Sequence, residues 1–118
     1  MTAFETAIKA AQLFSDKKGK DISVIKITEV SSLADYMVIA TGNNSTHVKA
    51  LADEVEFALK EQGRVVDHIE GHRTESWVLL DYSDVIINVF SDEAREYYGL
   101  ERLWQSGEAV DLTEYISD

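Results

Sequence analysis

The 118-residue sequence contains no cysteine and no proline. Without cysteine the chain has no disulfide framework, no thiolate zinc site and no cysteine nucleophile, a composition that suits the cytosol. Without proline, its turns and helix ends depend on glycine, asparagine, aspartate and serine. Glycine itself occurs only 6 times. Disulfide-stapled and proline-rich architectures are therefore excluded.

Positive charge is also scarce, because 11 lysines and arginines face 22 acidic residues and the formal net charge is −11 at pH 7. A domain this acidic repels phosphate backbones and anionic lipid surfaces unless its basic residues cluster tightly, and we identify no such cluster. No apolar run approaches the roughly 20 residues of a membrane helix, and the N-terminus does not resemble a targeting segment. We expect a cytoplasmic protein with little direct RNA contact and no membrane partner.

The pattern of apolar residues predicts one globular domain, with 45% hydrophobic residues in a chain long enough for one modest core. Helical spacing indicates helices at residues 4–14 and 48–59, and Ser91 begins a third, short helix. The apolar run at residues 36–40 is typical of a strand buried on both faces. Further strands are predicted at residues 21–30, 65–70, 76–80 and 84–90. The fold class is therefore α/β (α+β), with a single mixed sheet of about five strands and helices on both faces.

Three groups of residues suggest chemistry, and each has a simpler structural interpretation. The turn at residues 41–45 precedes a helix N-terminus but lacks the glycines and the lysine of a phosphate loop. His68, Glu70 and His72 alternate like zinc ligands, although Gly71 interrupts the strand. Asp81 and Asp84 flank a predicted hairpin, where aspartates more often bond to the backbone. We expect no catalytic residue, no metal site and no cofactor.

A cluster of aromatic and charged residues is the most distinctive feature of the chain. Six of its 11 aromatic residues lie within 28 positions, interleaved with arginines and glutamates. Tryptophan, tyrosine and arginine dominate the hot spots of protein interfaces, but aromatic residues also fill cores. An exposed subset would form a docking surface. The six aromatic residues are Trp77, Tyr82, Phe90, Tyr97, Tyr98 and Trp104.

At these residues the sequence resembles the ribosome silencing factor (RsfS, Iojap) family. The resemblance rests on Glu70-Gly71, on the runs at residues 77–90 and 95–104, and on the earlier run at residues 31–42 with Ser45 and residues 50–53 behind it. Blocks in the same order over so much of the chain are more specific than any single motif. The resemblance delimits a silencing-factor domain at residues 1–104 and an acidic C-terminal tail at residues 105–118.

The resemblance implies a fold related to the nucleotidyltransferase superfamily, without a known transferase activity. It also implies that the protein binds the uL14-type protein of the large ribosomal subunit, sterically blocks an intersubunit bridge and so represses translation when nutrients are scarce. The alternative is a nucleotidyltransferase-like enzyme that uses Ser45, Asp81 and Asp84 with a divalent metal. The sequence leaves open whether the chain forms a homodimer, through a sheet edge or the region of Trp104.

Carried over position by position, the resemblance implies a set of nine partner-binding residues. Trp77 lies in an apolar run and is equally consistent with an interface anchor and a core residue. We expect Tyr82→Ala or Asp84→Ala to weaken partner binding while the melting temperature stays nearly unchanged. The nine residues are Glu70, Trp77, Leu79, Asp81, Tyr82, Asp84, Arg95, Tyr98 and Glu101.

The chain departs from the family pattern at two positions. Ser83 stands in the hairpin where the family usually has glycine, which indicates either a turn that does not need positive φ or one that tolerates strain. Asn88 stands where the family usually has histidine. Because an asparagine amide does not exchange a proton near neutral pH, Asn88 argues against catalysis at that position.

Overall fold

A computed structural model describes residues 1–71, 76–99 and 106–116 of the chain. Its helices and strands follow the predicted order, with one additional short strand near the C-terminus. They are α1 (Ala3–Asp16), β1 (Lys20–Lys26), β2 (Tyr36–Gly42), α2 (Ser45–Glu61), β3 (His68–Glu70), β4 (Trp77–Asp81), β5 (Val85–Ser91), α3 (Asp92–Tyr98) and β6 (Glu108–Ala109).

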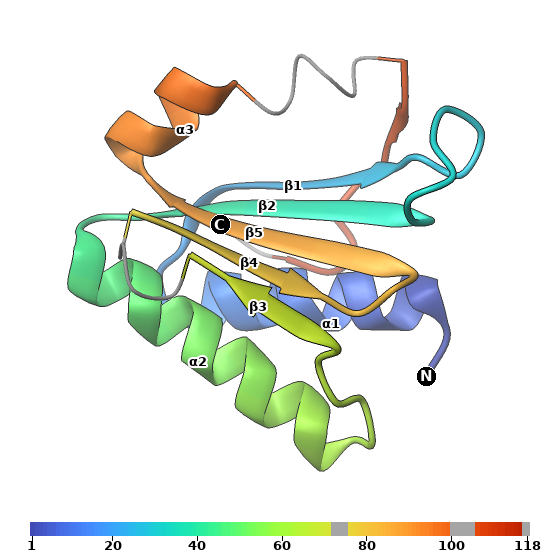
Figure 1. Ribbon diagram of the computed structural model, residues 1–118, viewed down its shortest axis with the longest axis horizontal. Helices are drawn as coiled ribbons and strands as arrows, with labels where there is room; N and C mark the ends of the chain where they lie inside the picture. Colours follow the sequence, from blue (N-terminus) through green and yellow to red (C-terminus); the bar gives the residue numbers. More distant parts are fainter. Residues whose placement is uncertain (72–75, 100–105, 117–118) are drawn as a thin grey trace.

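The six strands form one mixed sheet in the order β3-β4-β5-β2-β1-β6. β2 and β5 are parallel, and the other neighbouring pairs are antiparallel. Figure 1 shows α1 and α2 on one face of the sheet and α3 on the other. The predicted class, a mixed sheet with helices on both faces, is confirmed, and β6 raises the strand count from about five to six.

β2 lies at the centre of the sheet and is buried on both sides. Val38 and Ala40 belong to the core under α1 and α2, whereas Met37 and Ile39 belong to a smaller core under α3. Alternate residues of a strand point to opposite faces, so an uninterrupted apolar run is required wherever both faces are covered. The run at residues 36–40 is therefore a reliable signal of the two-sided architecture.

Polar residues and one glycine delimit the two long helices. Thr2 and Glu5 form a reciprocal capping box at the start of α1, and the Asn44 side chain accepts a hydrogen bond from the backbone of His47 at the start of α2. Gly63 follows α2 with a φ of 88°, and its N–H and that of Arg64 bond to the carbonyls of Lys60 and Leu59. These contacts satisfy the backbone groups that helix ends leave free.

The segment after residue 105 docks on the domain. Glu108 and Ala109 pair with β1, and the Val110 N–H donates to the Val24 carbonyl at 2.8 Å. Leu112 and Ile116 pack against the core under α1 and α2. This segment therefore extends both the sheet and the core. Among the described residues, no helix is long and apolar enough to cross a membrane.

The β4–β5 hairpin places Ser83 at a φ of 72°. Of the two interpretations of this serine, the structure supports the strained turn, because a side chain in the left-handed region clashes with its own backbone. Local bonds hold the turn: the Ser83 N–H donates to the Asp81 carboxylate at 2.8 Å, and the Ser83 hydroxyl bonds to the Asp67 carboxylate.

We predict that Ser83→Gly is more stable than Ser83→Ala by about 1 kcal/mol. Both variants lose the hydroxyl bond to Asp67, but only the glycine variant also relieves the backbone strain. Urea denaturation of both variants measures the difference. Equal midpoints with equal slopes would show that the turn is not strained.

Candidate functional site

The α3 side of the sheet is only partly covered by its helix. α3 packs against β5 and β2, and it leaves the outer face of β3 and β4 partly exposed. In antiparallel pairs, residues directly opposite share a face. The pairing of Glu70 with Leu79 and of His68 with Asp81 therefore brings two strands together on this face. We name this surface the β3–β4 strip; it consists of His68, Glu70, Trp77, Leu79, Asp81 and Ile86.

The β3–β4 strip combines an apolar centre with acidic and imidazole groups on its rim. Leu79 and Ile86 are half-buried, whereas the His68 and Glu70 side chains are exposed and their ring nitrogen and carboxylate oxygen lie 2.9 Å apart. Asp81 is half-buried and opposite Ile86. A partner that offers apolar side chains flanked by basic ones would complement this surface.

Trp77 belongs to both the core and the surface. Its ring stacks on Phe90 at a centroid distance of 5.4 Å and an interplanar angle of 20°. Its indole N–H donates to the Asn88 side-chain oxygen at 2.9 Å, and the residue as a whole is half-buried. Trp77 therefore packs within the domain without being fully buried, and its role as an interface anchor stays a prediction.

Asp84 is engaged by Arg64, which reaches the hairpin from the end of α2. The two Arg64 terminal nitrogens lie 2.6 and 3.3 Å from the Asp84 carboxylate oxygens, and one of them also donates to the Tyr82 carbonyl at 2.8 Å. The hydrogen bond to Asp84 raises the pKa of Arg64 above its ordinary value. Asp84 therefore fixes the hairpin to the α2–β3 connection, whatever else it contacts.

Tyr82 is only 2% exposed and belongs to the core under α1 and α2, on the opposite side of the sheet from the strip. The Arg64 guanidinium lies over its ring at 5.6 Å. Burial, followed by the nearby Glu56 carboxylate, raises the pKa of Tyr82 to about 12, and Arg64 opposes the shift. This position argues against the expectation that Tyr82→Ala leaves the melting temperature nearly unchanged, because the substitution would open a cavity.

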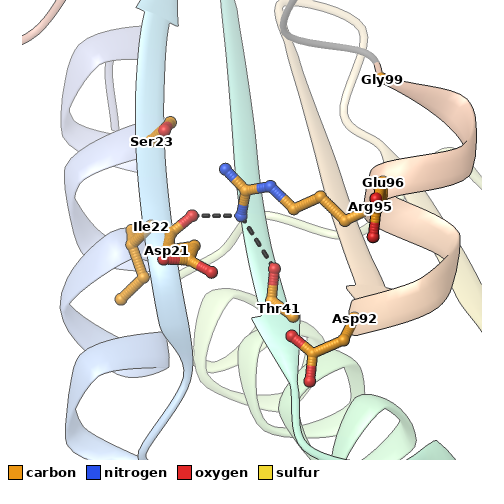
Figure 2. A pocket seen from close by; sticks show the side chains of 8 residues that line it. All are labelled: Asp21, Ile22, Ser23, Thr41, Asp92, Arg95, Glu96 and Gly99. Atoms are coloured by element: carbon orange, nitrogen blue, oxygen red, sulfur yellow. Dashed lines mark hydrogen bonds between the residues drawn. The ribbon is translucent and has the colours of Figure 1, made fainter.

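Arg95 lies on the same side of the sheet as the strip but turns toward β1 and β2. Figure 2 shows its guanidinium bonded to the Asp21 carbonyl and the Thr41 hydroxyl, the latter at 2.9 Å. The bonds cross a cavity of about 540 Å³ that Asp92 and Glu96 also line. Arg95 therefore connects α3 to β1 and β2.

The side chains of the two remaining predicted contact residues lie outside the described part of the structure. Tyr98 is the last residue of α3, and its side chain lies outside the described part of the structure. Glu101 lies outside the described residues altogether, as does His72 of the zinc hypothesis. Of the nine predicted residues, the structure therefore assembles four on the strip: Glu70, Trp77, Leu79 and Asp81.

The residues of the enzymatic alternative are not brought together. Ser45 follows the C-terminal end of β2, whereas Asp84 precedes β5 beside the N-terminal end of β2. The seven residues of β2 separate these two ends by about 20 Å. Asp81 ends β4 at the same end as Asp84. Among the described residues, no group of three or more histidine, aspartate and glutamate side chains could hold a metal ion.

Sequence reasoning missed three residues that shape the strip. Ile86 shares its face because it pairs with Asp81, and the hairpin register could have predicted this from the lengths of the two strands. Arg64 lies in the loop between α2 and β3, and Asn88 is buried at the centre of β5. Their contacts, to Asp84 and Trp77, depend on tertiary packing that no local pattern encodes.

We predict opposite effects for two substitutions at Tyr82. Its hydroxyl is buried and has no hydrogen-bond partner among the described residues, so Tyr82→Phe should be at least as stable as the wild type. Tyr82→Ala should lose about 3 kcal/mol, since it removes a buried ring. Chemical denaturation at pH 7 tests both. A Tyr82→Phe variant that loses more than about 1 kcal/mol would reveal a partner for the hydroxyl.

The same pair of proteins should differ at alkaline pH. The folded-state pKa of Tyr82, about 12, lies above the ordinary value of 10.0. Between these values the unfolded chain loses the phenolic proton and the folded chain keeps it, so stability falls as the pH rises through this window. Tyr82→Phe should lose less stability than the wild type from pH 9.5 to pH 11. Parallel curves would show that the folded and unfolded states titrate alike.

Comparisons with known proteins agree on one family. The family model described as ribosomal silencing factor during starvation (RsfS) matches residues 1–118. A ribosomal silencing factor of Halalkalibacterium halodurans is 35% identical over 92% of both chains. A crystal structure of a Chromobacterium violaceum protein superimposes with a TM-score of 0.86 at 39% identity, covering 89% of this chain and 88% of that one.

A more distant relative comes from mouse. Its name is mitochondrial assembly of ribosomal large subunit protein 1, and it is 30% identical over 78% of this chain and 42% of its own length. The similarity thus extends from bacterial proteins to a mitochondrial one, over most of the present domain. A whole-chain family match, together with a bacterial relative above 30% identity, places this chain in the ribosomal silencing factor (RsfS) family.

Proposed function

We propose that the protein binds the large ribosomal subunit through its uL14-type protein and thereby keeps the small subunit from joining. The observation that carries this proposal is the β3–β4 strip, an apolar and acidic surface on the side of the sheet that α3 only partly covers. Membership of the silencing factor family supports it, as does the mouse relative named for assembly of the large ribosomal subunit.

The composition of the strip suits a ribosomal protein better than ribosomal RNA. Leu79 and Trp77 offer apolar contact area, and Glu70 and Asp81 offer negative charge to basic side chains. The net charge of −11 opposes approach to RNA phosphates over the rest of the surface. The attraction would therefore be confined to one patch on a protein component of the subunit, in the cytoplasm, with little direct contact to RNA.

Inhibition in this proposal results from occupancy. A bound domain fills the space of an intersubunit bridge. The factor and the small subunit therefore compete for the same surface of the large subunit. The inhibited fraction then follows the ratio of free factor to its dissociation constant. The effect is stoichiometric and reversible, and it represses translation only while the factor is in excess of that constant.

The nine predicted contact residues take different parts in this proposal. Glu70, Trp77, Leu79 and Asp81 would touch the partner. Tyr82 and Asp84 would support the hairpin that carries them, because one is buried and the other is paired with Arg64. Arg95 would hold α3 in place through its bonds to β1 and β2. Tyr98 and Glu101 remain proposed contacts.

We predict that Leu79→Lys and Glu70→Lys weaken binding to purified large subunits by at least about tenfold each. Both place positive charge on a surface that is proposed to meet basic side chains. Phe57→Lys and Glu61→Lys are matched controls, because Phe57 is 63% exposed on α2 and Glu61 is exposed at its end, on the other side of the sheet. Co-sedimentation measures binding, and the yield of joined ribosomes measures inhibition.

Two results would contradict the proposal. One is that excess wild-type protein leaves subunit joining unchanged. The other is that strip and control variants lose binding equally, which would place the contact elsewhere or reflect net charge alone. Binding should also weaken as salt rises, because the proposed contact pairs acids with bases across a screened surface.

A further inference from the structure

Asn88 is a fully buried amide at the centre of β5. It lies beside Leu79 of β4 and Ile39 of β2 in the strand register, on the side of the sheet that carries the strip. Its side-chain oxygen accepts the Trp77 indole N–H at 2.9 Å, and its side-chain nitrogen lies 2.8 Å from the Met37 sulfur. Both ends of the amide therefore have partners.

The chemistry of the partners determines how the amide must be oriented. An indole N–H can only donate a hydrogen bond, and a thioether sulfur can only accept one. The oxygen of Asn88 must therefore face Trp77 and its NH₂ group must face Met37. A flipped amide would place two donors face to face at Trp77 and two acceptors face to face at Met37. This bond fixes the edge of the Trp77 ring that carries the nitrogen, and its acceptor belongs to a fully buried residue.

We infer that Asn88 is a positioning residue for the docking surface: it holds the Trp77 indole in the orientation that presents the accessible part of the ring on the β3–β4 strip. This inference rests on the proposed function, since it treats the strip as the contact surface. Because an amide does not titrate, the Asn88–Trp77 bond keeps its polarity throughout the physiological pH range.

The surroundings of Asn88 favour this pH independence. Ile39 and Leu79, beside it on the neighbouring strands, carry no titratable group, and neither does Met37 on β2 or Phe90 on β5. Among the described residues, the titratable groups on this side of the sheet include His68 and Glu70 on β3, Asp81 on β4, and Asp92, Glu93, Arg95 and Glu96 on α3, with Asp21 lining the same pocket as Arg95 and Lys20 paired with Asp92. His68 bonds to Glu70, and Arg95 turns toward Thr41.

The test replaces the amide by groups that change the bond in a known way. Asn88→Leu removes the acceptor at all pH values. Asn88→His keeps an acceptor while the ring is neutral and loses it when the ring is protonated, because both ring nitrogens then donate. Each variant is made in the full chain together with Trp104→Phe, so that Trp77 alone emits. The Trp104→Phe protein with Asn88 intact is the reference.

Two measurements follow for each protein: the emission maximum of Trp77, and the dissociation constant for purified large subunits at pH 8 and pH 5.5. Dividing each constant by that of the reference at the same pH removes every pH effect that the variants share with the reference. We expect Asn88→Leu to bind at least fivefold more weakly at both pH values, with a shifted emission. We expect Asn88→His to bind within about twofold of the reference at pH 8 and at least fivefold more weakly at pH 5.5.

A merely structural role for Asn88 would weaken binding only as far as the folded fraction of each variant falls, and chemical denaturation at both pH values measures that fraction. Asn88→Leu that binds like the reference with unchanged Trp77 emission would overturn the inference. If Asn88→Leu fails to fold, Asn88→His decides alone, and a binding ratio equal at both pH values would overturn it. A wild-type chain that fails to bind large subunits refutes the proposed function instead, and the emission of Trp77 in the reference and its variants still tests the orienting bond.

Discussion

The burial of β2 on both faces is the constraint from which the rest of the structure follows. A strand with Val38 and Ala40 on one side and Met37 and Ile39 on the other requires cover on both. α1 and α2, with 14 and 17 residues, cover one face broadly, whereas α3 has seven and covers only part of the other. The accessible strip on β3 and β4 is therefore the part of the sheet that the shortest helix does not reach.

The strip depends on the β4–β5 hairpin, which contacts from the opposite side of the sheet hold in place. Arg64 binds Asp84 and the Tyr82 carbonyl from the far side of the sheet, and Ser83 accepts a left-handed conformation to close the turn. These contacts fix the register of β4 against β5, and a slip of one residue would move Leu79 to the opposite face. Residues that are adjacent in the sequence therefore have different roles: Tyr82 and Asp84 support the hairpin, and Leu79 and Asp81 are proposed to contact the partner.

The structure separates the residues of the enzymatic alternative, and the surface that it leaves accessible suits the proposed binding role. Asp81 and Asp84 lie at the opposite end of the sheet from Ser45; Asp81 accepts a bond from the Ser83 N–H of the hairpin, and Asp84 pairs with Arg64. A binding role needs only a shaped and correctly charged surface, and such a surface tolerates an amide at position 88 where proton transfer would not. In the proposed function the acidity of the chain opposes contact with RNA, and the apolar centre of the strip favours contact with a protein.

Local patterns in the sequence predicted the fold class and every element except β6, because helical spacing, the apolar run of β2 and the capping residues each act over a few neighbouring positions. The family and the contact residues Glu70, Leu79 and Asp81 came from the resemblance instead, and the strand register places these three residues on a common face. Only the tertiary structure decided that Tyr82 is core, that Trp77 is shared between core and surface, and that Ser83 is strained. These properties depend on which residues, distant in sequence, close around a side chain, and Arg64 and Asn88 reach their partners only after the sheet has assembled.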